Sequence, residues 1–316
     1  MARVVVALGG NALQADTKDT SAKSQIVACE ATAKPIADLI EDGHEVIIAH
    51  GNGPQVGQIV ATYEASAAAN PSNPVMPFPE CGAMSQGYIG YHLQQAIRDE
   101  LNRRNIKKEV ASVVTQVVVD KNDPGFQNPT KPVGSFVSEE EAKVLEAEKG
   151  YVMKEDSGRG FRRVVASPVP VSVVEEGIVK TLVDAGHVVI TVGGGGIPVI
   201  EKEDGTLEGI PAVIDKDLAS EKIAELLDAD ELVILTAVEQ VAINFNTPQQ
   251  ENLSNITVAD AEKYMAEGHF APGSMLPKVK AAVMFAESKP GRKAIITSLE
   301  KARNALKGET GTIISC

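Results

Sequence analysis

Residues 36–57 read IADLIEDGHEVIIAHGNGPQVG, and this stretch carries the pattern that decides the fold. Apolar Leu39 and Ile40 belong to a helical pattern that stops at Gly43, a typical helix end. The run at 46–49 is continuously apolar, as in a strand that is covered on both faces. A glycine loop follows directly. The stretch therefore predicts a helix, a turn, a strand and a glycine loop in series.

Runs of the same kind recur along the chain, at residues 4–8, 110–119, 188–192, 232–235 and 294–296. Most of them are continuous rather than alternating, which is typical of parallel strands. Helical patterns such as residues 218–227 lie between them. This order predicts an α/β protein with a doubly wound, mainly parallel sheet.

The opening stretch has an internal counterpart. Residues 36–56 align without gaps on residues 179–199, with the Gly-His turn, the strand and the glycine loop in the same places. Loops at the carboxyl ends of strands bind ligands in open α/β folds, so two such loops would lie along one edge. Any two helix–strand units share a capping glycine and an apolar strand, and this simpler explanation stays open.

Residues 120–170 depart from this rhythm. They are rich in Gly, Pro, Lys and Arg, and they carry one modest helical segment at 138–149. We interpret them as an inserted small subdomain. It is either a surface insertion without a role in the site or a functional lid. Because basic residues are concentrated there in an acidic protein, the lid is at least as good an interpretation.

Two glycine loops, after the strands at 4–8 and 46–49, are candidate phosphate sites. Missing Cβ atoms let backbone N–H groups approach an anion. Pro54 stands where a helix would begin, so free helix amides would face the ligand. Glycine pairs after strands are also common turns, so the first loop alone decides little. The candidates are Gly9, Gly10 and Asn11 in the first loop, and Gly51, Asn52 and Gly53 in the second.

Residues 193–196 are four consecutive glycines after a strand. Such a run is entropically costly unless something must approach closely, which favours a nucleotide-phosphate contact over a purely conformational role. Lys216 lies between two aspartates at a helix start, and Lys278 follows Pro277 at another. A solvated ion-pair cluster is the plainer interpretation, but phosphoryl transfer requires lysines held in such positions.

The overall composition and charge exclude some classes of binding partner and cofactor. Lys and Arg total 30 against 43 Asp and Glu, a net charge of −13, which argues against nucleic acid. The three cysteines are far apart in the sequence and do not show the spacing of zinc ligands, which argues against a disulfide framework and against a structural zinc site. We therefore expect the protein to be in the reducing cytoplasm. We expect neither a membrane span nor a targeting segment. No Gly-Lys pair exists for a P-loop, and magnesium carried by substrate phosphates would need no motif.

Taken in order, the motifs resemble the carbamate kinase family over essentially the whole chain. Besides the glycine loops, the resemblance rests on residues 131–134 (KPVG), 158–165 (GRGFRRVV), 213–217 (VIDKD) and 272–278 (PGSMLPK). It implies a single domain over 1–316, an open αβα sandwich, with residues about 120–170 as a protruding acceptor lid. It also implies a homodimer and reversible, magnesium-dependent phosphoryl transfer between ATP and carbamate, giving ADP and carbamoyl phosphate.

The resemblance also assigns roles to single residues. Lys131 would reach the carbamate from the subdomain, Lys216 and Lys278 would stabilise the phosphoryl group and nucleotide phosphates, and Asp217 would hold the lysines. Donors around the phosphoryl group would come from Gly9, Gly10, Asn11, Gly51, Asn52 and Gly53. The nucleotide would contact Gly194, Gly195 and Tyr264. An aromatic packed on the core is an almost equally good account of Tyr264.

Two positions depart from the family pattern. Ser135 stands where proline is common and Phe161 where tryptophan is frequent, which bears on the stiffness of the subdomain. The resemblance further suggests ATP formation from carbamoyl phosphate in arginine catabolism. Another phosphotransferase of the same fold, or a non-catalytic nucleotide sensor, remains as an alternative, and an acceptor panel or a turnover assay separates them.

Overall fold

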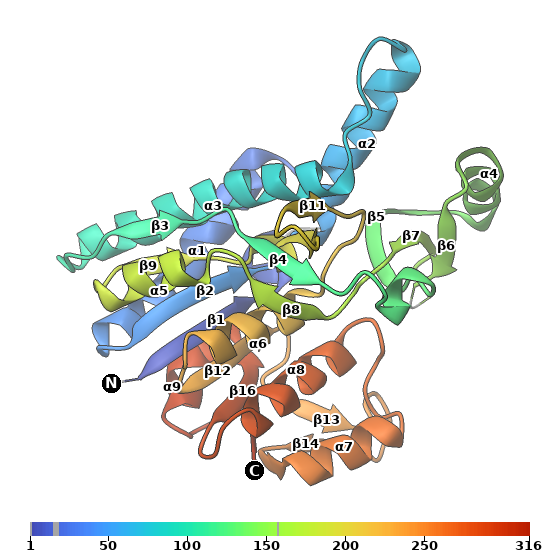
Figure 1. Cartoon of the computed structure of the whole chain (residues 1–316). Coiled ribbons are helices and arrows are strands. Elements are labelled where there is room, and N and C mark those ends of the chain that lie inside the picture. The colour runs from blue at the N-terminus through green and yellow to red at the C-terminus, as the bar shows by residue number, and fades with distance from the viewer. Residues whose placement is uncertain (1, 15–18, 157) are drawn as a thin grey trace.

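The computed structural model describes residues 2–14, 19–156 and 158–316. Its centre is an eight-stranded sheet in the order β15-β17-β16-β12-β1-β2-β9-β3 (Figure 1). All neighbours are parallel except β16 and β17. The strands are β1 (Arg3–Leu8), β2 (Glu45–His50), β3 (Val110–Ser112), β9 (Val188–Ile190), β12 (Glu231–Thr236), β15 (Asn255–Thr257), β16 (Lys293–Ser298) and β17 (Thr312–Ser315).

Helices cover both faces of this sheet, so β1 is apolar on both sides. Val4 and Val6 belong to one buried core, whereas Val5 and Ala7 belong to the other. The first core is formed with α1 (Ala22–Glu41), α3 (Phe78–Arg103) and α9 (Ala302–Leu306). The second is formed with α5 (Glu176–Asp184), α6 (Lys216–Leu226), α7 (Val258–Ala266) and α8 (Met275–Glu287). The predicted α/β class with a mainly parallel sheet is confirmed.

The expectation of one strand over 110–119 is wrong. The run breaks after β3, and β4 (Gln116–Val119) enters a second sheet in the order β11-β10-β4-β8. The break follows from a contact with α3: the Gln86 side chain accepts from the N–H of Thr115 at 2.8 Å and donates to its carbonyl at 3.0 Å. The other strands of this sheet are β8 (Pro170–Val173), β10 (Ile197–Glu201) and β11 (Leu207–Gly209).

The internal repeat has a structural counterpart. Its two strands, β2 and β9, are parallel neighbours, with Ile48 paired to Ile190. Their glycine loops therefore share one edge of the sheet, as predicted. After β2 the chain enters α2 (Gly53–Ala69), with Pro54 in its first turn, which also confirms the predicted helix start.

The segment predicted to be a subdomain forms its own three-stranded antiparallel sheet, β5-β7-β6, standing beside α2 and apart from the main sheet (Figure 1). The strands are β5 (Lys131–Val137), β6 (Val152–Glu155) and β7 (Phe161–Val165). The helix expected at 138–149 is α4 (Glu139–Lys149), which Ser138 and Glu141 begin with a capping box. Phe161, one of the two departures from the family pattern, opens β7; the Ser135 side chain lies outside the described part of the structure.

The subdomain contacts α2 at two levels. Near the glycine loop, a Cβ added to Gly57 would lie 2.3 Å from the Cα of Gly134 in β5. About two helical turns further on, Glu64 accepts from Arg163 at 3.3 Å and from Lys149 at 3.2 Å. Both contacts fix the position of β5, whose first residue is Lys131.

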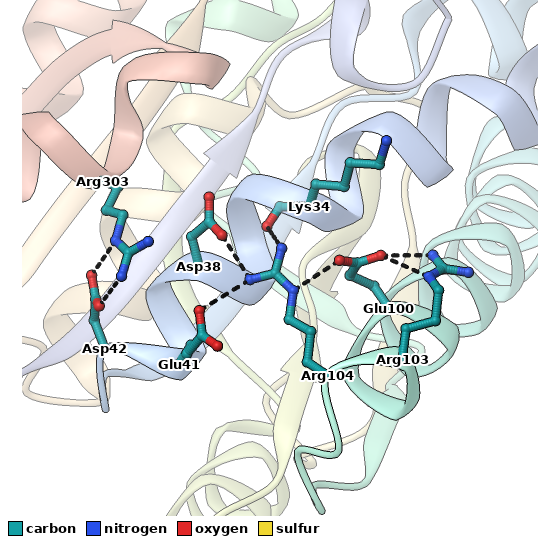
Figure 2. A network of polar contacts seen from close by, with 8 residues as sticks. All are labelled: Lys34, Asp38, Glu41, Asp42, Glu100, Arg103, Arg104 and Arg303. Carbon is teal, nitrogen blue, oxygen red and sulfur yellow. Dashed lines mark hydrogen bonds and ion pairs between the residues drawn. The ribbon is translucent and has the colours of Figure 1, made fainter.

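Charged side chains join the helices at the opposite, amino-terminal edge of the sheet (Figure 2). Arg104, at the end of α3, pairs with Asp38 of α1 at 2.7 Å and with Glu100 at 2.8 Å. Arg103 pairs with the same Glu100 at 2.7 Å. This network fastens the ends of α1 and α3 directly before β2 and β3 begin.

The remaining elements are short. They are the hairpin β13 (Val241–Ile243) and β14 (Glu251–Leu253), and the 3-10 turns η1 (Gly10–Ala12), η2 (Pro124–Phe126), η3 (Gly193–Gly195) and η4 (Leu299–Lys301). Among the described residues, no helix combines the length and apolar character needed to cross a membrane.

Replacing Gly57 by alanine tests the close approach of α2 and β5. The new methyl group would meet backbone atoms of Gly134, which no side-chain rotation can move away. We expect Gly57→Ala to lower the free energy of unfolding by about 1–3 kcal/mol. The matched control is Gly87→Ala in α3, where an added Cβ meets nothing within 4 Å. In urea titrations, equal or greater stability of Gly57→Ala would contradict the contact.

Candidate active site

Three glycine loops meet at the carboxyl-terminal edge of the sheet. They follow β1, β2 and β9, which are adjacent and parallel, so their ends lie together. The N–H of Gly51 donates to the carbonyl of Leu8 at 3.2 Å and joins the first loop to the second. An added Cβ at Gly10 or Gly53 would meet no atom within 4 Å, so both positions border open space. A ligand therefore has room beside the backbone at both positions.

The third loop packs tightly against its neighbours. Gly194 and Gly195 have φ angles of 67° and 94°, in the region that favours glycine. A Cβ on Gly194 would lie 2.2 Å from Nδ2 of Asn52, and one on Gly195 would lie 2.2 Å from the carbonyl oxygen of Ile214. The backbone conformation and the close packing are therefore sufficient reasons for glycine at both positions, without any ligand. Their contact with a nucleotide stays a prediction.

The second loop is anchored from α3. Buried Asn52 donates from Nδ2 to the hydroxyl of Ser85 at 2.8 Å, which fixes its side chain behind the loop. The backbone of Asn11 lies in η1, whereas its side chain is outside the described part of the structure.

A buried carboxylate binds two lysines beside these loops. Asp217 accepts from Lys216 Nζ at 2.5 Å through Oδ1 and from Lys278 Nζ at 2.9 Å through Oδ2. The Asp217 side chain is 3% exposed, and those of Lys216 and Lys278 are 11% and 14% exposed. Lys216 is the first residue of α6, and Lys278 lies in the first turns of α8. The predicted residues therefore come together from two helix starts that are far apart in the chain.

The electrostatics of this cluster follow from burial and charge. Burial alone would raise the pKa of Asp217, but the charges of Lys216 and Lys278 outweigh it and hold the pKa well below its usual range. The pKa of Lys216 is lowered by burial and by Lys278, while Asp217 opposes the shift. One carboxylate between two ammonium groups leaves a net positive charge. A bound anion would complete the balance.

Asp215 connects the subdomain to this cluster, and sequence reasoning did not single it out. Its Oδ2 accepts from Lys131 Nζ at 2.6 Å, across 84 residues of chain. Its Oδ1 accepts from the N–H of Asp217 at 2.8 Å and caps α6. The available signal was an aspartate directly before a helix start, which predicts a cap but not the partner in β5.

Tyr264 in α7 is half-buried and packs against the main core. Its ring meets the edge of His269 at 5.7 Å between centroids. This agrees with the core-packing alternative, and a place in the nucleotide site stays a prediction.

Both oxygens of Asp217 are engaged by lysines, so this carboxylate positions cations rather than presenting free ligands to a metal.

His50 lies at the end of β2, between the second and third loops. It is 1% exposed, and Nδ1 donates to the carbonyl of Gly51 at 2.9 Å. Burial lowers its pKa to about 4, with a further contribution from the charge of Lys216. The ring is therefore neutral near pH 7 and adds no charge to the site.

Comparison with known proteins assigns the class. The model of the amino acid kinase family matches residues 2–298, and this chain belongs to that family. The fold of the chain is shared with the solved relative described below.

Proteins named carbamate kinase or carbamate kinase-like are among the similar members of the family. A carbamate kinase of Clostridium perfringens is 60% identical over 312 residues, 99% of both chains. A carbamate kinase-like protein of Escherichia coli is 57% identical over 312 residues, covering 99% of this chain and 98% of the relative. The solved carbamate kinase from Giardia lamblia bound to AMP-PNP is 43% identical with a TM-score of 0.90, covering 99% and 98% of the two chains.

The low pKa of His50 predicts an acid-sensitive fold. The unfolded chain binds this proton near pH 6.5, whereas the folded protein resists it down to about pH 4. The free energy of unfolding should therefore fall as pH drops through this window, by up to about 3 kcal/mol from His50 alone. Urea titrations of wild type and His50→Gln between pH 7 and 4 measure it. A difference between the two proteins that stays constant with pH would contradict the buried neutral ring.

Proposed function

We propose that the protein is a carbamate kinase that transfers a phosphoryl group reversibly between ATP and carbamate, with ADP and carbamoyl phosphate on the other side. The observation that carries this proposal is the buried Asp217 holding Lys216 and Lys278 where three glycine loops meet. Relatives named carbamate kinases, up to 60% identical over nearly the whole chain, support carbamate as the acceptor.

The site fits a reaction that needs positioning and charge neutralisation. Carbamate is already an anion, so no general base is required to activate it. Charge on the transferring phosphoryl group would be met by Lys216 and Lys278, whose ammonium groups are held 2.5 and 2.9 Å from Asp217. Because Asp217 fixes both, the donors are in place before the ligand arrives.

The remaining predicted residues take places around this centre. Lys131, held by Asp215, would contact carbamate or carbamoyl phosphate from the subdomain. Residues 120–170 would thus act as the acceptor lid of a single domain over 1–316. Backbone and side-chain donors around the phosphoryl group would be Gly9, Gly10, Asn11, Gly51, Asn52 and Gly53, with Gly194, Gly195 and Tyr264 toward the nucleotide.

Magnesium would be carried mainly by the nucleotide phosphates and would supply charge neutralisation there. The side chains of the site agree with this arrangement, because both oxygens of Asp217 already accept hydrogen bonds from lysines. The chain's own contribution is then to bind and orient the phosphates with lysines and loop amides.

We also propose a cytoplasmic homodimer that forms ATP from carbamoyl phosphate during arginine catabolism. Cys29, Cys81 and Cys316 are free thiols, which agrees with a reducing compartment. Analytical ultracentrifugation tests the dimer, and growth on arginine of a strain lacking the protein tests the pathway.

Removing either central lysine should stop turnover. A lysine about 4 Å from a phosphate oxygen contributes about 4 kcal/mol at an effective dielectric of 20, or about three orders of magnitude in rate. We expect Lys216→Ala and Lys278→Ala to lower ATP formation from ADP and carbamoyl phosphate at least about 100-fold. The matched control is Lys280→Ala, an exposed lysine of the same helix α8.

Near wild-type rates in both lysine variants would exclude this mechanism. If folded wild-type protein formed no ATP, carbamate would be the wrong acceptor. A panel of small carboxylates and phosphates with ATP would then identify another phosphotransferase activity, and ligand binding without turnover would indicate a sensor.

The dual role of Asp215 gives a separate prediction. Asparagine caps helices as well as aspartate but carries no charge for Lys131. Asp215→Asn should keep the stability within about 0.5 kcal/mol, raise the KM for carbamoyl phosphate and leave the KM for ADP unchanged. Asp215→Ala, which also loses the cap, serves as the comparison. An unchanged carbamoyl phosphate KM in both variants would show that the 2.6 Å ion pair does not position Lys131.

A further inference from the structure

A cavity of about 780 Å³ lies between α2 and the subdomain. Gly10 of the first glycine loop borders it at one end, and Phe78, at the start of α3, is part of its wall. Within the described residues, its lining does not include Lys131, Lys216 or Lys278. The cavity therefore lies beside the proposed phosphoryl site rather than at it, and it borders the first loop at Gly10 and the end of the second at Pro54.

The charges around this cavity do not balance. The charged residues that line it are Glu64, Lys149, Arg159, Arg162 and Arg163. Glu64 is shared by Lys149 and Arg163, at 3.2 and 3.3 Å. Asp156 is shared by Arg159 and Arg162, both at 3.1 Å. Among these described ion pairs, two carboxylates serve four cations, an excess of two positive charges in a protein of net charge −13.

Aromatic rings hold these guanidinium groups in place. Arg159 and Arg162 lie 4.7 and 5.1 Å from the ring centroid of Phe136. Arg163 lies 3.7 Å from the centroid of Tyr151, whose hydroxyl donates to Glu64. Arg162 Nε also donates to the carbonyl of Gly134 at 3.1 Å. Fixed guanidinium groups match the oxygens of phosphates and carboxylates.

We propose that this cavity captures the dianionic acyl phosphate substrate before it reaches the lysines, an inference that rests on the proposed function. Carbamoyl phosphate carries two negative charges near neutral pH, which equals the cation excess. It is far smaller than the cavity, so it arrives still hydrated and moves past Gly10 to the transfer site. Without such a site, the negative charge of the whole protein would repel it.

The nucleotide does not fit this role, because its proposed contacts, Gly194, Gly195 and Tyr264, belong to the third loop and α7. Neutralising a cavity arginine should therefore affect one substrate and not the other. Arg159 is the suitable residue, because its side chain is 61% exposed and its removal leaves Arg162 paired with Asp156.

The experiment measures ATP formation from ADP and carbamoyl phosphate by wild type, Arg159→Gln, Arg159→Lys and Arg103→Gln. Arg103 is the matched control: it is 59% exposed and pairs with Glu100 at i,i+3 (Figure 2). Arg159 pairs with Asp156 at the same spacing. It lies at the far end of α3, about 37 Å along the helix from Phe78.

We expect Arg159→Gln to raise the KM for carbamoyl phosphate roughly 3- to 10-fold at low ionic strength. The kcat and the KM for ADP should stay unchanged, and the effect should vanish at about 0.5 M salt, where surface charges are screened. Arg159→Lys, which keeps the charge, should restore most of the wild-type KM. Arg103→Gln should match the wild type.

Equal KM values for Arg159→Gln and Arg103→Gln would overturn the capture site and leave the proposed function intact. A rise that persists at high salt, or that Arg159→Lys shares, would also overturn it, by showing a structural role for the arginine. No ATP formation by wild type would overturn the proposed function and the capture site together.

Discussion

The candidate active site depends on one buried carboxylate, Asp217. Two ammonium groups buried side by side at helix starts would repel each other and the positive ends of the helices. Asp217 makes the arrangement tolerable by accepting from Lys216 at 2.5 Å and from Lys278 at 2.9 Å. One carboxylate cannot balance two cations, so a positive charge remains where the loops open. The folded protein therefore keeps a local excess of positive charge, which an anionic ligand neutralises. Such a local excess is needed to bind phosphates in a chain whose net charge is negative.

The parallel sheet brings the other components to this carboxylate. Because β1, β2 and β9 run side by side in one direction, their loops open on the same edge. The packing between loops is tight enough that Gly194 and Gly195 have no room for a side chain. The subdomain is then placed by contacts with α2 at Gly57 and Glu64 and by Asp215. The position of Lys131 therefore depends on the rigidity of α2 as well as on its own ion pair.

Features that depend on neighbouring residues in the chain, such as strands and helix starts, could be predicted from local sequence patterns. Continuous apolar runs predicted the parallel strands, and Pro54 predicted the start of α2. The meeting of Lys216 and Lys278 at Asp217 was expected from the family resemblance and not from a local pattern. Long-range contacts could not be predicted in this way. The pairing of Asp215 with Lys131 spans 84 residues and has no local signature. The break between β3 and β4 depends on Gln86, whose amide satisfies both backbone groups of Thr115. The glycines at 194–195 have a packing reason that the sequence alone cannot separate from ligand contact.

Arg159, at the cavity, and the two central lysines differ in depth, and this separates their roles. Arg159 is mostly exposed, so salt screens its charge and its attraction for an anion is weak. Lys216 and Lys278 are nearly buried, where charge interactions are strong and little screened. An anion that passes from the cavity to the lysines therefore exchanges water for fixed donors in stages. Such a gradient favours inward movement without a tight outer site, which would hold the substrate away from the phosphoryl acceptor.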